Sequence, residues 1–218
     1  MNTCYEEKFG IPRQPGLCPS AWGRLVFAEK YRSVEALRGL DGFSHVWILF
    51  GFHQTQEQGW SPTVRPPRLG GNERVGVFAS RSTFRPNGLG LSLCRVEGID
   101  LTDPAGPVLL LGGVDILDGT PVYDVKPYLP YAEAPAITTS GYANDPPLAK
   151  EIEIAPSAEA FFQALPQRSQ AIIRESLSFD PRPAAHQSES RIYGVKMCHC
   201  EVKFQVDEVV RIVGISWI

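Results

Sequence analysis

Arginine is concentrated in one stretch of the chain, residues 60–90, where it is interspersed with proline and glycine. Guanidinium groups pair with phosphates and carboxylates through two parallel hydrogen bonds, and they stack on planar rings. Proline fixes the path of a loop, and glycine lets backbone amides approach a ligand closely. The stretch therefore indicates a binding site for an anionic or planar ligand, with nucleic acid as the first candidate. It contains one acidic residue, Glu73, and five arginines: Arg65, Arg68, Arg74, Arg81 and Arg85.

Two further segments carry side chains suited to a pocket wall. Residues 8–17, KFGIPRQPGL, hold an arginine and Gln14 between two prolines. They form either a rigid, donor-rich wall or an arm tied to the surface. The apolar run 43–54, FSHVWILFGFHQ, ends at His53 and Gln54. Side chains at a strand end commonly line a site, because the strand holds them in place.

Two turns combine tight geometry with charged groups. In RSTFRPNGLG, Arg81 and Arg85 lie four residues apart with Phe84 between them. Such a set can clamp a base by stacking and an anion by paired hydrogen bonds. In VDILDGTPVYDVK, Asp118 precedes Gly119 at a predicted hairpin turn, where its carboxylate can contact a ribose, an amine or a cation. Both segments are candidate binding loops as well as turns.

Composition and charge exclude several classes of protein. The 218 residues carry a formal net charge of −3, so contact with nucleic acid must use a local basic patch. No apolar run approaches the length of a membrane span, and the N-terminus lacks the apolar segment of a secretory signal. The sequence has no P-loop, no dinucleotide-binding motif and no serine-hydrolase motif. We therefore expect no membrane association and no Rossmann-type cofactor site.

The five cysteines favour a reducing, cytoplasmic location, because their number is odd and their spacing is irregular. Cys198, His199 and Cys200 form one dense cluster of metal-ligating residue types. In a strand, the two thiols would point to one face and the imidazole to the other, so the three could not converge on one ion. We therefore expect no metal site.

The hydrophobic pattern predicts a mainly β chain followed by a smaller α+β part. Helical spacing of apolar residues runs over 157–177 and is interrupted by Pro166, which can begin a second helix. Ser33 is a plausible N-cap for a short helical turn, and the strand at 43–54 is apolar enough to be buried on both faces. Strands are expected at 22–29, 43–54, 75–80, 91–99, 108–117, 121–126 and within 191–218.

A change of composition marks the domain organisation. Residues 127–156 are rich in proline and small residues and have no sustained period, which is typical of an extended crossing segment. We therefore predict a mostly β domain over 1–135, a linker over 136–156 and a small α+β domain over 157–218.

Five sequence blocks, in order over residues 6–134, resemble the TsaA/TrmO family of S-adenosylmethionine-dependent tRNA methyltransferases. They are EKFGIPRQPGL, GLDGFSHVWILFGFHQ, WSPTVRPPRLGGN, GVFASRSTFRPNGLGLS and DGTPVYDVKPYLPYAEA. DPRPA at 180–184 matches the same family. Two features depart from its pattern: only Cys4 and Tyr5 stand where a longer first strand is common, and Ala185 occupies a position that is usually aromatic.

The resemblance implies a fold, a reaction and an assembly. The N-terminal domain is expected to be a β-barrel that binds S-adenosylmethionine, and the molecule a homodimer with the donor near the subunit interface. The expected reaction is methylation of N6 of N6-threonylcarbamoyladenosine at position 37, beside the anticodon, in threonine tRNA. The donor contacts implied are Gln14, Pro15, Gly16, His53, Gln54, Arg81, Leu91, Asp118, Gly119, Thr120 and Pro121.

The chemistry of that reaction suggests roles for further residues. His53 or Asp118 could accept the proton that leaves the nitrogen. Arg65, Arg68 or Arg85 could pair the threonyl carboxylate, and Phe84 or Tyr128 could stack on the base. Phosphates could be bound by Arg182, Lys196, Lys203 and Arg211, which could equally be solvated surface residues.

Two alternatives to this function stay open. The first is a non-catalytic RNA-binding module for the anticodon loop, which would use the same arginines. The second is a methyltransferase for another adenosine or for a small molecule.

Overall fold

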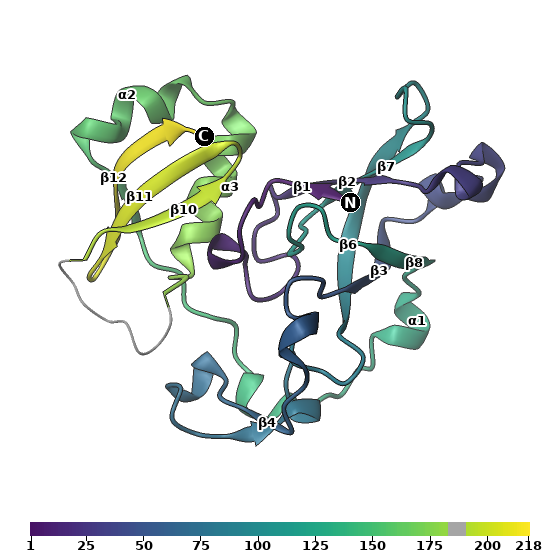
Figure 1. Cartoon of the computed structure of the whole chain (residues 1–218), viewed down its shortest axis with the longest axis horizontal. Helices are drawn as coiled ribbons and strands as arrows, with labels where there is room; N and C mark the ends of the chain where they lie inside the picture. Colours follow the sequence, from purple (N-terminus) through teal and green to yellow (C-terminus); the bar gives the residue numbers. More distant parts are fainter. Residues whose placement is uncertain (183–190) are drawn as a thin grey trace.

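The computed structural model describes residues 1–182 and 191–218, and it contains two main sheets (Figure 1). The larger one has six strands, all paired antiparallel, in the order β1-β2-β7-β6-β3-β8. The mainly β prediction for this part is confirmed. The strands are β1 (Asn2–Thr3), β2 (Trp22–Val26), β3 (His45–Gly51), β6 (Leu89–Asp100), β7 (Val108–Gly112) and β8 (Val122–Pro127).

The two outer strands of this sheet are connected through an irregular segment. In the described residues no ladder pairs β1 with β8. The chain just before β8 instead contacts β1: the Thr3 amide donates to the Asp118 carboxylate (2.8 Å), and the Gly119 amide donates to the carbonyl of Met1 (3.0 Å). The Thr3 hydroxyl donates to the carbonyl of Ile116 (2.8 Å). The sheet therefore curls until its edges are near each other, without a continuous ladder around it.

Strand β3 is shorter and less buried than the sequence suggested. It spans His45–Gly51, and only one of its faces, with Val46, Ile48 and Phe50, is in the core. The other face is half-buried, and the Trp47 indole donates to Glu133 (2.8 Å) in helix α1 (Pro130–Glu133). The expectation of burial on both faces was wrong, because an antiparallel sheet needs only one face against the core.

Two local predictions are corrected in the same part of the chain. Residues 75–80 form a strand only at β5 (Val75–Gly76), which pairs with β4 (Thr63–Val64), and a 3₁₀ turn follows at Val77–Ala79. Ser33 precedes the turn Val34–Leu37, but its side chain makes no capping hydrogen bond.

The smaller sheet is covered by two helices, α2 (Pro156–Ala164) and α3 (Gln167–Ser178) (Figure 1). Their apolar residues Phe162, Ile172 and Leu177 are buried, as the helical spacing predicted. Pro166 is the residue before α3 rather than its first residue. The four strands, in the order β10-β11-β12-β9, are β10 (Tyr193–Met197), β11 (Cys200–Val206), β12 (Val210–Trp217) and β9 (Ile152–Ile154).

Strand β9 was not predicted, and it lies inside the segment expected to be a linker. It pairs in parallel with β12 through three residue pairs. Three residues are too few for a periodic signal, so the sequence showed only the proline-rich surroundings.

The turn between β10 and β11 corrects another prediction. Cys198 and His199 form a two-residue hairpin turn with φ of 56° and 61°, and Met197 pairs with Cys200 across it. The three residues do not lie in one strand as assumed. Within residues 1–182 and 191–218, no group of three His, Cys, Asp or Glu side chains is placed to hold a metal ion.

The N-terminal twenty residues pack the two sheets together. Phe9 stacks with Tyr193 and Phe204, with ring centroids 6.2 and 6.1 Å away. The buried Tyr5 hydroxyl lies 3.0 Å from the Ser176 hydroxyl on α3. Both parts therefore contribute to one continuous core.

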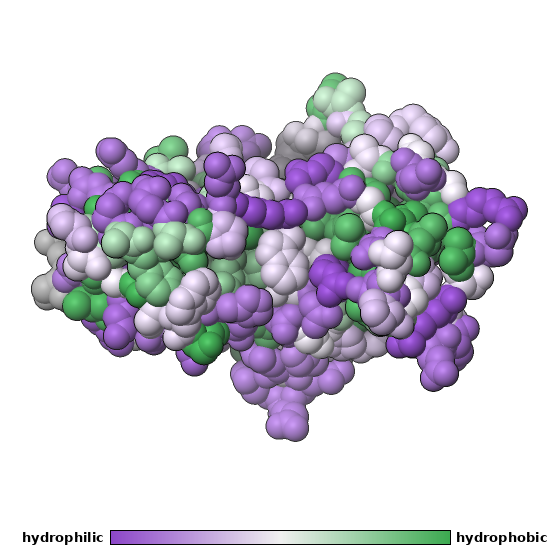
Figure 2. All heavy atoms as spheres, turned by 90° about the horizontal axis from the view of Figure 1, so that it is seen from above, coloured by the Kyte–Doolittle hydropathy of each residue, from purple (hydrophilic) through white to green (hydrophobic). Residues whose placement is uncertain are grey.

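The surface of the molecule is mixed in polarity. On the face seen from above, apolar patches over both parts are broken by hydrophilic side chains (Figure 2). No described helix has both the length and the apolar character required to traverse a lipid bilayer.

Candidate functional site

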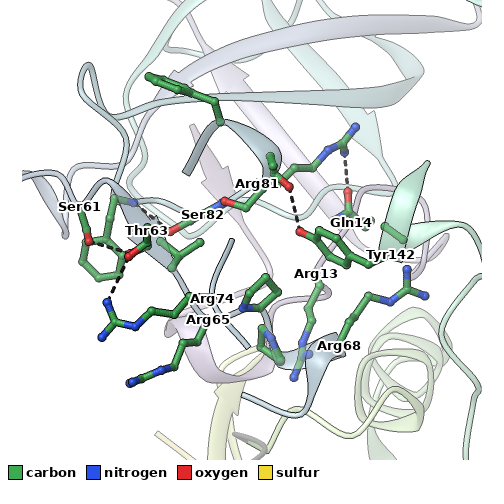
Figure 3. Close-up of a pocket in the computed structure, with 18 of the residues that line it drawn as sticks. Arg13, Gln14, Ser61, Thr63, Arg65, Arg68, Arg74, Arg81, Ser82 and Tyr142 are labelled. Atoms are coloured by element: carbon green, nitrogen blue, oxygen red, sulfur yellow. Dashed lines mark hydrogen bonds between the residues drawn. The ribbon is translucent and has the colours of Figure 1, made fainter. Parts of the chain in front are cut away.

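A cavity of about 1500 Å³ lies between the N-terminal loop, the β4–β5 ribbon with its flanking loops, and the segment around Tyr142 (Figure 3). Among the residues that the structure describes, the charged side chains of its lining are all arginines, with no acidic residue. Among the described residues, none of these arginines has a carboxylate within ion-pair distance, although the chain as a whole is negatively charged. The site therefore favours anions. The lining arginines are Arg13, Arg65, Arg68, Arg74 and Arg81.

One wall joins two predicted donor contacts that are far apart in the chain. Arg81 donates from Nη1 to the side-chain oxygen of Gln14 (2.5 Å). The loop that carries Gln14 is anchored because the Gly16 amide donates to the carbonyl of Gly113 (2.9 Å). Gly16 and Gly113 both have positive φ, 79° and 68°, which explains why glycine is needed at this close approach.

A partly buried carboxyl lies near this wall. Asp115 accepts a hydrogen bond from the Ser92 hydroxyl (2.5 Å). Burial raises the pKa of Asp115 to about 6, while the Ser92 hydrogen bond and the charge of Arg81 act in the opposite direction. The negative charge of Asp115, which interacts with Arg81, therefore appears as the pH rises through about 6.

The remaining predicted donor contacts lie elsewhere in this chain. His53, Gln54 and Leu91 do not line the cavity, and neither do residues 118–121. The end of β3, which precedes His53 and Gln54, is adjacent to the segment 118–121, because the Gly51 amide donates to the carbonyl of Pro121 (3.0 Å). The structure thus divides the predicted donor set into two groups, with Gln14 and Arg81 in one and the end of β3 with 118–121 in the other.

The segment 118–121 also supports the N-terminus. Asp118 accepts from the Thr3 amide, and the terminal ammonium of Met1 donates to the carbonyl of Thr120 (3.0 Å). Burial lowers the pKa of the Met1 amine, and the charge of Asp118 partly offsets that effect. Asp118 therefore has a structural partner that the sequence did not reveal.

Three of the predicted tRNA contacts, Arg65, Arg68 and Phe84, line the cavity. Arg85 does not line it: Nη1 of Arg85 donates to the carbonyls of Val77 (3.2 Å) and Ser80 (2.7 Å), so its side chain braces that turn.

Tyr128 and Arg182 do not line the cavity either, and their side chains contact other residues of the chain. Tyr128 packs edge-on against Trp47, with ring centroids 6.0 Å apart. Arg182 makes a two-pronged pair with both Asp180 oxygens (2.8 Å each) and donates to the carbonyl of Val206 (3.1 Å), which leaves its side chain 9% exposed. Contact of Arg182 with a phosphate stays a prediction, and in this chain its donors are already engaged by Asp180 and by the carbonyl of Val206.

A family model described as the tRNA-methyltransferase O N-terminal domain matches residues 1–134, and one for the TrmO C-terminal domain matches residues 147–216. The chain belongs to the TrmO family. This confirms the resemblance seen in the sequence blocks.

Relatives within the family are similar over nearly the whole chain. A protein of Escherichia coli (strain K12) named tRNA (adenine(37)-N6)-methyltransferase is 48% identical, covering 95% of this chain and 91% of its own length. One of that name from Eikenella corrodens is 46% identical over 76% of this chain and 92% of its own length. The crystal structure of TrmO from Pseudomonas aeruginosa superposes with a TM-score of 0.80 at 38% identity, covering 99% of this chain and 93% of that one.

The structure places in this TrmO-family cavity two residues that the sequence marked only as part of candidate binding segments, Arg13 and Arg74, and one that it missed, Tyr142. Arg13 stands next to Gln14 and Arg74 belongs to the arginine-rich stretch, so their composition was a signal, but neither was given a role. Tyr142 donates to the carbonyl of Ala79 (3.1 Å) and lines the cavity from a segment interpreted as a linker. No spacing or motif marked it.

The C-terminal basic residues are placed on the smaller sheet. Arg211 pairs with Glu153 (2.9 Å), and Lys203 lies 4.0 Å from Glu201. These contacts favour the interpretation of a solvated strand face. The family departure at Ala185 lies outside the described residues.

Proposed function

We propose that this protein transfers a methyl group from S-adenosylmethionine to N6 of adenosine 37 in tRNA. The single observation that carries the proposal is the arginine-lined cavity, in which the described residues place no carboxylate. Relatives of the chain are named tRNA (adenine(37)-N6)-methyltransferase or putative S-adenosylmethionine-dependent methyltransferase. Phosphates of a single-stranded loop supply the negative charge that such a lining attracts. A tRNA substrate also agrees with a cytoplasmic location.

The specific substrate we propose is N6-threonylcarbamoyladenosine in threonine tRNA. Its threonyl group carries a carboxylate, which an arginine binds well through two hydrogen bonds. Arg68 is our candidate, since it lines the cavity and one of its nitrogens is already held by the carbonyl of Asp145. Phe84 lines the same cavity and offers a ring on which the splayed-out base can stack.

We further propose a homodimer that completes the donor site. On the outer face of the larger sheet, Leu91 lies opposite Leu49, and Tyr123 lies over Gly51. Leu91 and Tyr123 are 53% and 57% exposed, so this face of the sheet presents uncovered apolar surface. A second copy on this face would cover them and lie beside the β3 end. The donor would then bind near the interface, within the proposed domain 1–135.

Methyl transfer depends mainly on the alignment of the adenine nitrogen with the methyl group of the donor. When bound, the donor supplies an electrophilic methyl group on a sulfonium. The chain's task is to hold the weakly nucleophilic adenine nitrogen in line with it, which can account for much of the acceleration. The nitrogen also loses a proton. His53 is exposed at the end of β3 and is a better candidate acceptor than Asp118, whose carboxylate accepts from the Thr3 amide.

Labelled donor and purified threonine tRNA, with and without the threonylcarbamoyl group, test these statements together. Methyl transfer to position 37 only in the modified tRNA is the expected result. Equal transfer to both tRNAs would remove the carboxylate recognition, and binding without transfer would favour the non-catalytic RNA-binding module. Transfer to another adenosine or to a small molecule would support the other alternative.

The donor site is tested separately by calorimetry. We expect Arg81→Ala to abolish binding of S-adenosylmethionine, while Arg38→Ala, an exposed arginine that does not line the cavity, leaves it unchanged. Wild-type affinity in the Arg81 variant would reject the assignment of Arg81 to the donor.

A further inference from the structure

The β4–β5 ribbon places two arginines opposite each other. Val64 pairs with Val75 at the last rung of this antiparallel ribbon, so Arg65 and Arg74 are the next pair across it. Both line the cavity, and Figure 3 shows their side chains extending to the same side of it. In Figure 1 the ribbon lies at the bottom of the molecule, away from both main sheets.

These two arginines have no charge partner among the described residues. Nη1 of Arg74 donates to the Thr63 hydroxyl (3.2 Å), and no carboxylate of residues 1–182 or 191–218 is within ion-pair distance of Arg65 or Arg74. Like charges opposite each other on a ribbon are destabilising. An anion held between them would remove the repulsion.

The loop that joins the two arginines is stiffened by proline at the end next to Arg65. Pro66 and Pro67 follow Arg65, and Pro66 is buried. Gly70 and Gly71, with φ of 66° and 73°, reverse the chain. The backbone positions from which the two arginine side chains extend are therefore constrained before a ligand arrives, which lowers part of the entropic cost of binding.

Aromatic side chains lie in the same cavity. Trp60 is 56% exposed and lines it together with Phe78 and Phe84. Cationic groups that follow a phosphate backbone, combined with rings on which bases stack, are typical of sites for single-stranded nucleic acid.

We propose that Arg65 and Arg74 form a clamp for one phosphodiester of the tRNA anticodon loop, separate from the Gln14–Arg81 wall. The inference rests on the proposed function, since it presumes that tRNA enters this cavity. It assigns Arg74 a binding role and makes Arg65 a backbone contact rather than a carboxylate contact.

The salt dependence of tRNA binding tests the clamp. When a protein neutralises one phosphate fewer, the slope of log Kobs against log salt concentration falls in magnitude by roughly 0.7–0.9. Because the phosphodiester is held only between the two guanidinium groups, loss of either one should release it. We therefore expect this change in Arg74→Ala and in Arg65→Ala, with unchanged S-adenosylmethionine binding by calorimetry. Arg74→Lys should keep most of the slope, because it keeps the charge. Arg38→Ala is the matched control and should keep the wild-type slope.

The double variant decides whether one phosphate is shared. If both arginines hold it, the loss of affinity in the double variant is smaller than the product of the two single losses. Wild-type slopes in both single variants, or losses that multiply, would refute the clamp.

Two further outcomes have separate meanings. A loss seen only with threonylcarbamoyl-modified tRNA would refute the clamp and identify the anion as the threonyl carboxylate. Failure of the wild-type protein to bind tRNA at all would refute the proposed function instead.

Discussion

The carboxyl of Asp115 makes the stability of the protein depend on pH in a predictable direction. Burial raises its pKa from 3.8 to about 6, so the folded state holds this proton more tightly than the unfolded state. Stability from this group is fully present below pH 4 and is lost as the pH rises through 6. About two pKa units correspond to about 3 kcal/mol, and because Asp115 is only partly buried we expect about 1–3 kcal/mol.

Asp115→Asn removes the titration and should remove this loss. Relative to wild type, the variant should gain about 1–3 kcal/mol in free energy of unfolding between pH 4 and pH 8. Urea unfolding at a series of pH values measures this difference, and the contributions of all other groups cancel in it. A difference between variant and wild type that stays constant with pH would refute the reasoning.

Ser92→Ala provides a second test of the same site. The Ser92 hydroxyl donates to Asp115 and lowers the pKa of its carboxyl. Without it, the pH at which stability is lost should move upward. The Asp115 carboxyl carbon, followed by NMR, should titrate at a higher pH in this variant, and a lower titration point would contradict the assigned cause.

Three substitutions, the last with a matched control, test backbone strain, a buried hydrogen bond and core packing. His199 has a φ of 61°, a left-handed conformation that glycine adopts with less strain than histidine. His199→Gly should therefore raise stability by up to about 1 kcal/mol in a thermal melt. A lower melting temperature would show that the contact of His199 with Glu6 contributes more than the relieved strain. Tyr5→Phe should cost about 1–2 kcal/mol in urea unfolding, because it removes the hydrogen bond to the Ser176 hydroxyl, and an unchanged midpoint would deny that bond a net role. Gly90→Ala should cost about 1–3 kcal/mol, because an added methyl would overlap the Phe50 ring, whereas Gly42→Ala, with open space around it, should be tolerated; equal effects of the two would contradict the packing.

The long elements and the binding loops could be predicted because they leave local signals. Alternating apolar residues marked β10 to β12, and helical spacing marked α2 and α3. The arginine-rich stretch was recognisable from its composition, and it supplies four of the five arginines in the cavity.

Other features had no local signal. The three residues of β9 are a strand only because β12 lies beside them. Arg85 and Arg182 resembled free ligand-binding cations in the sequence, yet backbone carbonyls and Asp180 occupy them in the fold. A partner far away in the chain cannot be seen from residue type or spacing.

The sequence by itself determined the family, the mainly β character and the loops that carry the charge, since these depend on residue type, order and short-range periodicity. Only the tertiary structure decided which arginines face one cavity, where the described residues supply no counter-charge. It also showed that Gln14 meets Arg81, and that Asp118 supports the N-terminus. Those outcomes depend on contacts across the chain, which burial and hydrogen bonding select only once the whole fold is formed.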